Sequence, residues 1–345
     1  MEAIFLVFEL IQIALGKRNE LSCNPTAEQW EAIKQFACKN ALAGIVFTAI
    51  EKLPQSQYPD KAVLMTFFAQ AAQYKRNSQQ QQHVANKLAK LWRTIGVEPI
   101  VLKGPSVAQY YPKPEYRYSC DLDVFADKGW KDACDLLESK GVTLEYEIYK
   151  EAEFHIDGVY VEFHRYITPV RGNKVLHQFE LYLRELLLQE KAYFEDSLLV
   201  KPPLMFVVML HVQHALGDFL KAHLSFKHIV DWVVLRDLPF DRAQFHEDCK
   251  RFGFDRFLLL LDALADVVEG KRNYQELNPK EKRIFDELMA QKVKTQKNTR
   301  FAQHVELFFE FVNNAKRFNE YGYCSIYSFL FNVLWAHFFQ KEVKL

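Results

Sequence analysis

Three blocks of hydrophobic patterning follow one another along the chain. Apolar residues recur at helical spacing over residues 1–95 and again over 171–345, whereas short apolar runs separated by turn signals fill residues 96–170. This pattern predicts an N-terminal helical region, a small mixed α/β core and a C-terminal helical domain. The expected fold class is therefore α+β, with a small mixed sheet flanked by two helical regions.

The helical blocks contain specific boundary signals. Thr26 is a predicted cap for a helix over TAEQWEAIKQFACKN. A long helix is predicted to begin after Pro59-Asp60 and to run through Gln79–Gln82, which we interpret as a polar helix face because apolar positions resume on both sides. Helices are also predicted near the end of the chain, over residues 300–318 and 325–339.

The middle block alternates strands with helices. EPIVLKG is a predicted strand that ends at Lys103-Gly104, and Pro105 begins a helix at a position where its missing N–H has no consequence. CDLDVFA is the second strand, and Gly141 closes the helix that follows it. Further on, Asp157-Gly158 is a strong signal for a two-residue hairpin between the last two strands.

The composition of the chain limits which binding partners and which cellular compartment are expected. Lys plus Arg and Asp plus Glu both total 44 in 345 residues, so long-range attraction to nucleic acid or to an acidic membrane is not expected. The apolar stretches at the two ends are too short to cross a bilayer. Six scattered cysteines without a CxxC pair favour reduced thiols over a disulfide framework or a zinc knuckle. A cytoplasmic protein is expected.

Two aspartates interrupt the apolar strand CDLDVFA. Asp121 and Asp123 are two positions apart, so their side chains point to the same side of the strand. At about 6 Å and an effective dielectric near 20, their repulsion is roughly 3 kcal/mol before desolvation is counted. The simple alternative is a strand end at which both carboxylates reach water. A divalent cation between them removes the repulsion, and Mg²⁺ (or Mn²⁺) favours such oxygen ligands.

A third carboxylate completes a metal-binding set. Glu162 lies in VYVEFHRY on the same strand face as His164, and three carboxylates can hold two metal ions that clamp the attacking and leaving oxygens of a phosphoryl transfer. Glu145 and Glu147 are rivals for this role, but their alternation with apolar residues is typical of a solvated face.

The segment before the two aspartates has the pattern of a phosphate site. A strand, a glycine turn and a helix start converge at Gly104, and free backbone N–H groups at such a turn bind phosphate. Lys103 and Ser106 add a positive charge and a hydroxyl group. No Walker loop and no GxGxxG motif is present, which excludes those nucleotide-binding folds.

Together these residues resemble the DNA polymerase beta-like nucleotidyltransferase superfamily, and within it an uncharacterised bacterial nucleotidyltransferase family. The resemblance covers residues 99–166 well and the helical segments HVQHALGD and FKHIVDWVVLR more loosely. The motifs that carry it, in chain order, are Leu102-Lys103-Gly104, Tyr110-Tyr111-Pro112, Arg117 and Asp121-Leu122-Asp123.

The resemblance implies a nucleotidyltransferase-like core and roles for its residues. By it, Asp121 and Asp123 bind magnesium, Glu162 completes the carboxylate set, and Gly104 with Ser106 holds the triphosphate. The chain departs from the family pattern at Pro105, where a small residue is usual, and in the sixteen residues that separate Gly104 from Asp121.

Several further side chains are candidates for the same site. Arg117 can neutralise phosphate charge, the alternative being an exposed surface arginine. Lys227 is a secondary candidate for phosphate contact, although an i,i+4 ion pair with Asp231 also explains it. His211 and His214 have a spacing compatible with a metal site, but without further ligand motifs two polar core histidines are favoured. They are accessory candidates, together with His164.

The sequence thus predicts a magnesium-dependent nucleotidyltransferase. It would move a nucleoside monophosphate from a nucleoside triphosphate to an acceptor hydroxyl on a small molecule or a protein, releasing pyrophosphate. The alternative is a catalytically inactive nucleotide-binding or protein-interaction module, which the altered glycine motif and the large helical apolar faces allow.

Overall fold

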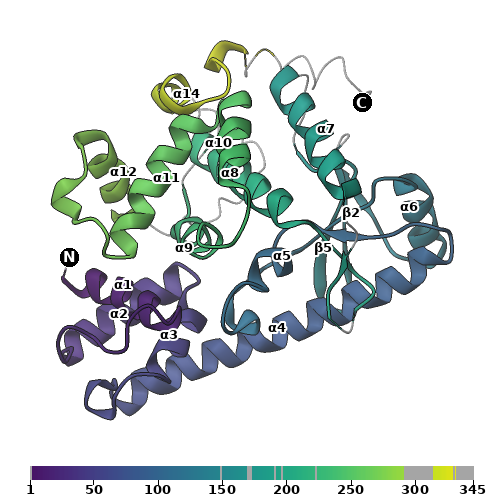
Figure 1. Cartoon of the computed structure of the whole chain (residues 1–345). Helices are drawn as coiled ribbons and strands as arrows, with labels where there is room; N and C mark the ends of the chain where they lie inside the picture. Colours follow the sequence, from purple (N-terminus) through teal and green to yellow (C-terminus); the bar gives the residue numbers. More distant parts are fainter. Residues whose placement is uncertain are drawn as a thin grey trace.

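A computed structural model gives the α+β fold that the hydrophobic pattern predicts. It describes residues 2–147, 150–168, 173–189, 192–195, 197–221, 224–290, 314–328 and 331. One mixed seven-stranded sheet is surrounded by helices from both halves of the chain (Figure 1). Within the described ranges, no helix has the length and apolar character needed to cross a bilayer.

Three short helices precede a long one, as predicted. They are α1 (Glu2–Ala14), α2 (Ala27–Lys39) and α3 (Ala43–Ile50). The predicted cap of α2 is confirmed, because the Thr26 side chain accepts a hydrogen bond from the Gln29 backbone N–H in a capping box. Asp60 caps α4 (Lys61–Arg93), which runs from the N-terminal helices to the far end of the sheet (Figure 1).

The sheet contains two strands that the sequence analysis did not predict. Its spatial order is β3-β4-β5-β2-β1-β7-β6. The bounds are β1 Ile100–Val101, β2 Leu122–Phe125, β3 Glu145–Glu147, β4 Glu151–Ile156, β5 Val159–His164, β6 Ala192–Tyr193 and β7 Val200–Lys201. The last two strands have two residues each and lie beyond residue 170, so they are too short to show an alternating pattern. They extend the core into a segment where only helices were expected.

The strand register brings the predicted carboxylates to one face. The hairpin prediction is confirmed, since Asp157 and Gly158 both have positive φ (49° and 78°) between β4 and β5. β5 pairs in parallel with β2, and Asp123 is directly opposite Glu162. Directly opposed residues share a sheet face, so the two carboxylates lie side by side.

The two sheet faces have different partners. Leu122 and Val124 of β2 are buried in one hydrophobic cluster with Trp92 of α4 and Ala133 of α6 (Trp130–Ser139). The alternate residues, Asp123 among them, point to the opposite face. That face is covered by helices from the second half of the chain, which close the site.

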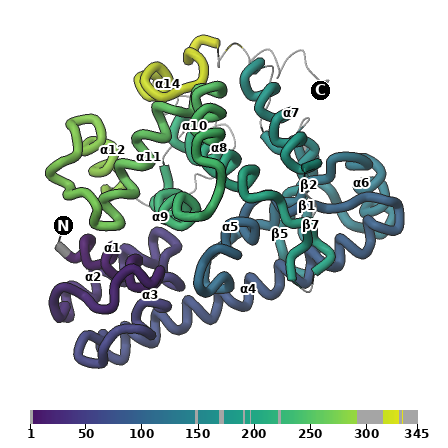
Figure 2. Tube along the Cα trace, viewed as in Figure 1, coloured from purple at the N-terminus to yellow at the C-terminus, as the bar shows by residue number. Residues whose placement is uncertain are grey.

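The helices of the second half share their core with the N-terminal helices. They are α7 (Lys174–Gln189), α8 (Leu204–Lys221), α9 (Phe226–Leu235), α10 (Arg242–Arg251), α11 (Asp255–Val268), α12 (Pro279–Ala290) and α14 (Ala315–Tyr321). The Phe8 ring stacks on Phe226 with centroids 5.5 Å apart, and both belong to a single buried cluster. Figure 2 shows α1 to α3 beside α9 and α11. Helices were also predicted over residues 300–318 and 325–339, and most of these residues lie outside the part of the chain that the structure describes.

Candidate functional site

A glycine turn follows β1. Gly104 has φ +51°, and a Cβ at this position would come within 2.8 Å of the Ser119 Oγ. Only glycine fits both constraints without strain. Pro105 begins α5 (Pro105–Ala108), as predicted, but this helix has only four residues. A helix dipole therefore adds little here, and positive charge for a phosphate has to come from side chains.

Ser106 does not reach the turn as the sequence analysis expected. It is fully buried, and its Oγ donates a 2.5 Å hydrogen bond to the Val101 carbonyl. Its hydroxyl holds the end of β1 against α5 and lies outside the residues that line the neighbouring cavity. Ser119, which the sequence analysis did not single out, lines that cavity instead and donates to the Asp121 carbonyl at 3.1 Å.

Asp123 is the most enclosed of the three carboxylates. It is 3% exposed, and its Oδ1 accepts hydrogen bonds from Lys103 Nζ and from His164 Nε2, each at 2.8 Å. Burial alone would raise the pKa of Asp123, but the neighbouring Lys103 and His164 hold it below its ordinary value. Asp123 therefore stays ionised, and among the described contacts both donors use the same oxygen.

His164 lies among three carboxylates. Its Nε2 is 3.5 Å from Glu162 as well as 2.8 Å from Asp123, and its Nδ1 is 2.8 Å from Glu151 Oε2. The Glu151 contact falls outside hydrogen-bond angles, so it is electrostatic. Burial disfavours a charged imidazole, but the nearby carboxylates of Asp123, Glu151 and Glu162 raise the pKa of His164 to about 10. The ring is thus protonated at neutral pH.

Glu151 was missed by the sequence analysis. It begins β4 directly opposite His164 and is 3% exposed, with its carboxylate paired to Lys150. A buried glutamate at the first position of a strand has no distinctive sequence signal, because its burial depends on the hairpin register. Glu145, one of the two rivals considered for the third carboxylate, lies on β3 with an exposed side chain, as its alternation predicted.

Asp121 has the least compensated charge. Its pKa is raised, first by burial and then by the nearby charges of Asp123 and Glu162, which Lys103 only partly offsets. Among the described residues it has no ion-pair partner at salt-bridge distance. A carboxylate in this state gains most from a cation.

The entry to β2 is held by a buried glutamine. Gln81 of α4 is 5% exposed, and its Nε2 donates to the carbonyls of Ser119 and Asp121 at 3.3 and 3.1 Å. The prediction that Gln79–Gln82 is a polar face of a long helix is confirmed by α4, and on that face Gln81 is buried. This side chain fixes the backbone that carries the first aspartate.

A cavity of about 260 Å³ joins the sheet to the helices of the second half. It is lined by the glycine turn after β1, α5, the start of β2, α8 and α9. Of the predicted site residues, the cavity brings together Lys103, Gly104, Arg117, Asp121, Asp123, His211, His214 and Lys227. Glu162 lies next to it, with its ligand atom within 4.8 Å of those of Asp123 and His164.

The two cationic candidates Arg117 and Lys227 differ in whether they are free to contact a phosphate. Arg117 is buried, and its guanidinium makes two hydrogen bonds to the Asp231 carboxylate. The Nε–Oδ1 distance is 2.8 Å and the Nη2–Oδ2 distance is 2.7 Å. Its Nη1 also donates to the Gly104 carbonyl at 3.3 Å. The geometry supports a positioning role for Arg117 in place of phosphate contact. Lys227 does not pair with Asp231 in the structure, and its Nζ lies 3.4 Å from the Tyr118 carbonyl.

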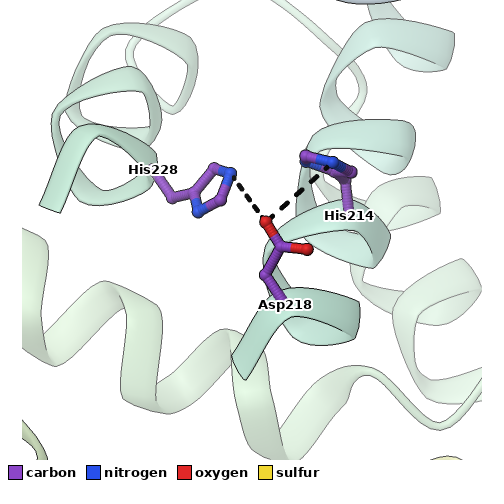
Figure 3. A group of neighbouring side chains, drawn as sticks. All are labelled: His214, Asp218 and His228. Carbon is purple, nitrogen blue, oxygen red and sulfur yellow. Dashed lines mark ion pairs between the residues drawn. The ribbon is translucent and has the colours of Figure 1, made fainter. Parts of the chain in front are cut away.

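His211 and His214 of α8 have different partners, although their spacing on the helix is compatible with a shared metal site. His211 Nε2 lies 3.0 Å from the His228 carbonyl, so this ring is engaged with α9. His214 instead faces Asp218 one turn along α8, with His228 on the other side of the same carboxylate (Figure 3). Burial is the largest cause that lowers the pKa of each ring, to about 3 for His228. These histidines are neutral at pH 7.

The carboxylate set fits a magnesium ion. Asp123 and Glu162 offer hard oxygen ligands from two adjacent strands within 4.8 Å of each other, and Asp121, just before β2, lacks a counter-ion among the described residues. Lys103 and His164 supply the positive charge that balances Asp123 in the metal-free arrangement.

Comparison with protein families places this site in context. Residues 26–268 match a family described as "Uncharacterised nucleotidyltransferase". The match extends over more than two thirds of the chain and includes every residue of the cavity. The chain belongs to this family. A comparison with curated proteins found no match.

Membership in this nucleotidyltransferase family supports nucleotidyl transfer as the general activity and a nucleotide as substrate. The matched region begins at the capping residue of α2 and ends with α11. It therefore contains both the sheet and the helical wall of the cavity. α1, α12 and α14 lie outside it.

Proposed function

We propose that the protein is a magnesium-dependent nucleotidyltransferase that moves a nucleoside monophosphate from a nucleoside triphosphate to an acceptor hydroxyl. The observation that carries the proposal is the pairing of Asp123 with Glu162 on two parallel strands, with Asp121 and Asp123 both lining a cavity that begins at the Gly104 turn. The order of these motifs supports membership of the polymerase beta-like superfamily, and the resemblance on which this rests points to a bacterial source.

The transfer requires few protein groups. The acceptor oxygen attacks the α-phosphorus, the bond from that phosphorus to the β-phosphate oxygen breaks, and pyrophosphate leaves. Magnesium, when bound, supplies the charge that stabilises the attacking and leaving oxygens. Asp121 and Asp123 orient it, and Glu162 helps to hold it and accepts the acceptor proton. Most of the rate enhancement in such transfers comes from positioning and charge neutralisation.

The triphosphate lies along the cationic side of the cavity in this proposal. Lys103 and Lys227 line the cavity from the end of β1 and from α9, and Gly104 is part of the same lining. Arg117 acts indirectly, because it holds the Gly104 carbonyl and is itself fixed by Asp231.

The acceptor is a small molecule or a protein in this proposal. The balanced net charge argues against a nucleic-acid acceptor and gives no reason to expect a membrane partner. We place the protein in the cytoplasm because all six cysteines are free thiols, two of them buried.

Transfer of label from a nucleoside triphosphate tests the proposal. The purified chain is incubated with magnesium, α-labelled triphosphates and cell extract, and labelled products are separated. Asp121→Asn is expected to remove the labelled product, whereas Asp135→Asn, on the exposed face of α6, is expected to leave it unchanged. Equal labelling by wild type and Asp121→Asn contradicts the assignment.

One observation favours the second candidate, a catalytically inactive nucleotide-binding module. Lys103 and protonated His164 already neutralise Asp123, so a metal has to compete with them. Magnesium-dependent binding of a triphosphate without any labelled product, across all four common bases, supports the module over the enzyme.

A further inference from the structure

A second group of potential metal ligands lies on the helical wall of the cavity. His214 and Asp218 are one turn apart on α8, and His228 projects from the start of α9. Figure 3 shows the two imidazoles on either side of the Asp218 carboxylate. His214 Nε2 is 4.0 Å and His228 Nε2 is 3.6 Å from the same Oδ2. The three ligand atoms all lie within 4.8 Å of one another.

We infer that His214, Asp218 and His228 bind a divalent metal of the zinc class. This site is distinct from the magnesium site on the sheet and does not rest on the proposed transferase activity. Two imidazoles and one carboxylate favour Zn²⁺ or Co²⁺ over Mg²⁺, which prefers oxygen ligands.

The distances suit a zinc ion after a small adjustment. Tetrahedral ligands at about 2.0–2.1 Å from zinc are separated by roughly 3.3 Å. The His228–Asp218 pair is already close to this separation, and His214 can move because about a third of its side chain is exposed. By contrast, 3.6 and 4.0 Å are too long for hydrogen bonds, so the two imidazoles face the Asp218 carboxylate without hydrogen bonding to it.

The environment of His228 gives an independent reason for a ligand. Its side chain is 8% exposed, and its Nδ1 has no hydrogen-bond partner in the structure. Its Nε2 points to Asp218 from beyond hydrogen-bond distance. A buried imidazole whose Nδ1 has no partner is costly, and coordination of a metal through Nε2 would stabilise the ring in this position.

His211, the third histidine on the helical wall, does not contribute to the proposed zinc site. His211 is engaged with the His228 carbonyl and so fixes the start of α9, but it is not available as a fourth ligand. All three proposed ligands line the cavity. A zinc ion held by three protein groups thus keeps an open position that faces the cavity, the arrangement of catalytic zinc sites. Four aspartates against three cationic side chains line this cavity, which favours a cation.

Direct metal titration tests the inference. The full chain is stripped with a chelator and titrated with Zn²⁺ alone by calorimetry, and with Co²⁺ by visible absorption. A single zinc equivalent is expected, with the intense Co²⁺ bands of a tetrahedral nitrogen-containing site. Asp218→Asn and His214→Gln should each weaken zinc binding by at least roughly 100-fold, because even second-shell partners change metal affinity by 10–100-fold.

Two controls keep the result interpretable. His83→Gln, an exposed histidine on α4, should bind zinc as wild type does. Asp121→Asn should keep the zinc site while losing magnesium-dependent triphosphate binding, which separates this inference from the proposed function. If His228→Gln fails to fold, the variant of the more exposed His214 still carries the test. Unchanged zinc affinity in His214→Gln overturns the inference, and so does a zinc site that disappears only in Asp121→Asn.

Discussion

Arg117 and Asp231, 114 positions apart, form a buried two-pronged ion pair that joins the glycine turn to α9. Arg117 is 7% exposed and Asp231 is 1% exposed. Tyr111 also donates a 2.7 Å hydrogen bond to Asp231, and Arg117 donates to the Gly104 carbonyl. The helical wall of the cavity is therefore tied to the turn on which the proposed triphosphate lies.

Asp231→Asn should destabilise the protein strongly. It leaves the Arg117 guanidinium buried without its counter-charge, and breaking a buried pair from one side costs about 3–5 kcal/mol in the free energy of unfolding. The measurement is urea unfolding at pH 7. Asp135→Asn, which breaks an exposed i,i+4 pair with Lys131, is the matched control and should cost less than about 1 kcal/mol. Equal losses of unfolding free energy in the two variants would contradict the prediction that the buried pair stabilises the fold more than the exposed one.

The same pair predicts a pH dependence. Burial alone would raise the pKa of Asp231, but Arg117 holds it well below its ordinary value of 3.8. A carboxylate whose folded pKa is depressed contributes stability that is complete above its unfolded pKa and is lost as the pH falls through the folded one. Protonated Asp231 resembles asparagine, so the gap between wild type and Asp231→Asn should be largest above about pH 5 and shrink below pH 4. A constant gap between pH 7 and pH 3 would show that Asp231 is not the titrating group.

The two aspartates of β2 should respond oppositely to substitution in the metal-free protein. From the sequence, removal of either charge relieves their repulsion. In the structure, Asp123→Asn instead removes the ion-pair partner of Lys103 and the carboxylate hydrogen-bonded to protonated His164, and a loss of about 3 kcal/mol or more is expected. Asp121→Asn should be neutral or stabilising by up to about 1 kcal/mol, since no ion pair among the described residues is lost. Chemical unfolding with EDTA present distinguishes these outcomes, and the reverse order would show that the charges are assigned wrongly.

Magnesium should stabilise the wild type by mass action. At 100 times its dissociation constant, a ligand that binds only the folded state adds about 2.7 kcal/mol. The melting temperature of the wild type should therefore rise with magnesium, and that of Asp121→Asn should not. Asp135→Asn is again the control, because its charge lies on the exposed face of α6. A rise of equal size in Asp121→Asn would remove this residue from the metal site.

The parts of the fold that the sequence predicted are those set by local chemistry. The Thr26 capping box, the Asp157-Gly158 turn and the alternation that places Leu122 inside one face and Asp123 on the other each depend on a few adjacent residues. The order of strands and helices in the middle block follows from the same signals.

The rest depends on contacts between distant segments. Glu151 and Gln81 are buried only because strand pairing and the path of α4 bring them to the site. Arg117 looked like a phosphate ligand until its partner 114 residues away was known. No local pattern records which of several carboxylates an arginine or a histidine will face, and so the ion pairs of the candidate site could not be predicted from the sequence.

The last prediction concerns Gly104, where two constraints can be separated. Gly96 and Gly104 both have positive φ, at +77° and +51°, but a Cβ at Gly96 meets nothing within 4 Å whereas one at Gly104 would approach the Ser119 Oγ to 2.8 Å. Alanine at either position should cost about 1–2 kcal/mol in backbone strain. Only Gly104→Ala should also weaken magnesium-dependent triphosphate binding, by roughly 2 kcal/mol, or about 30-fold, the scale of a lost charged hydrogen bond. Calorimetry with a non-hydrolysable triphosphate measures this, and adding Ser119→Ala should restore part of the affinity by making room for the Cβ. If Gly104→Ala binds the triphosphate as tightly as Gly96→Ala, the turn does not contact phosphate.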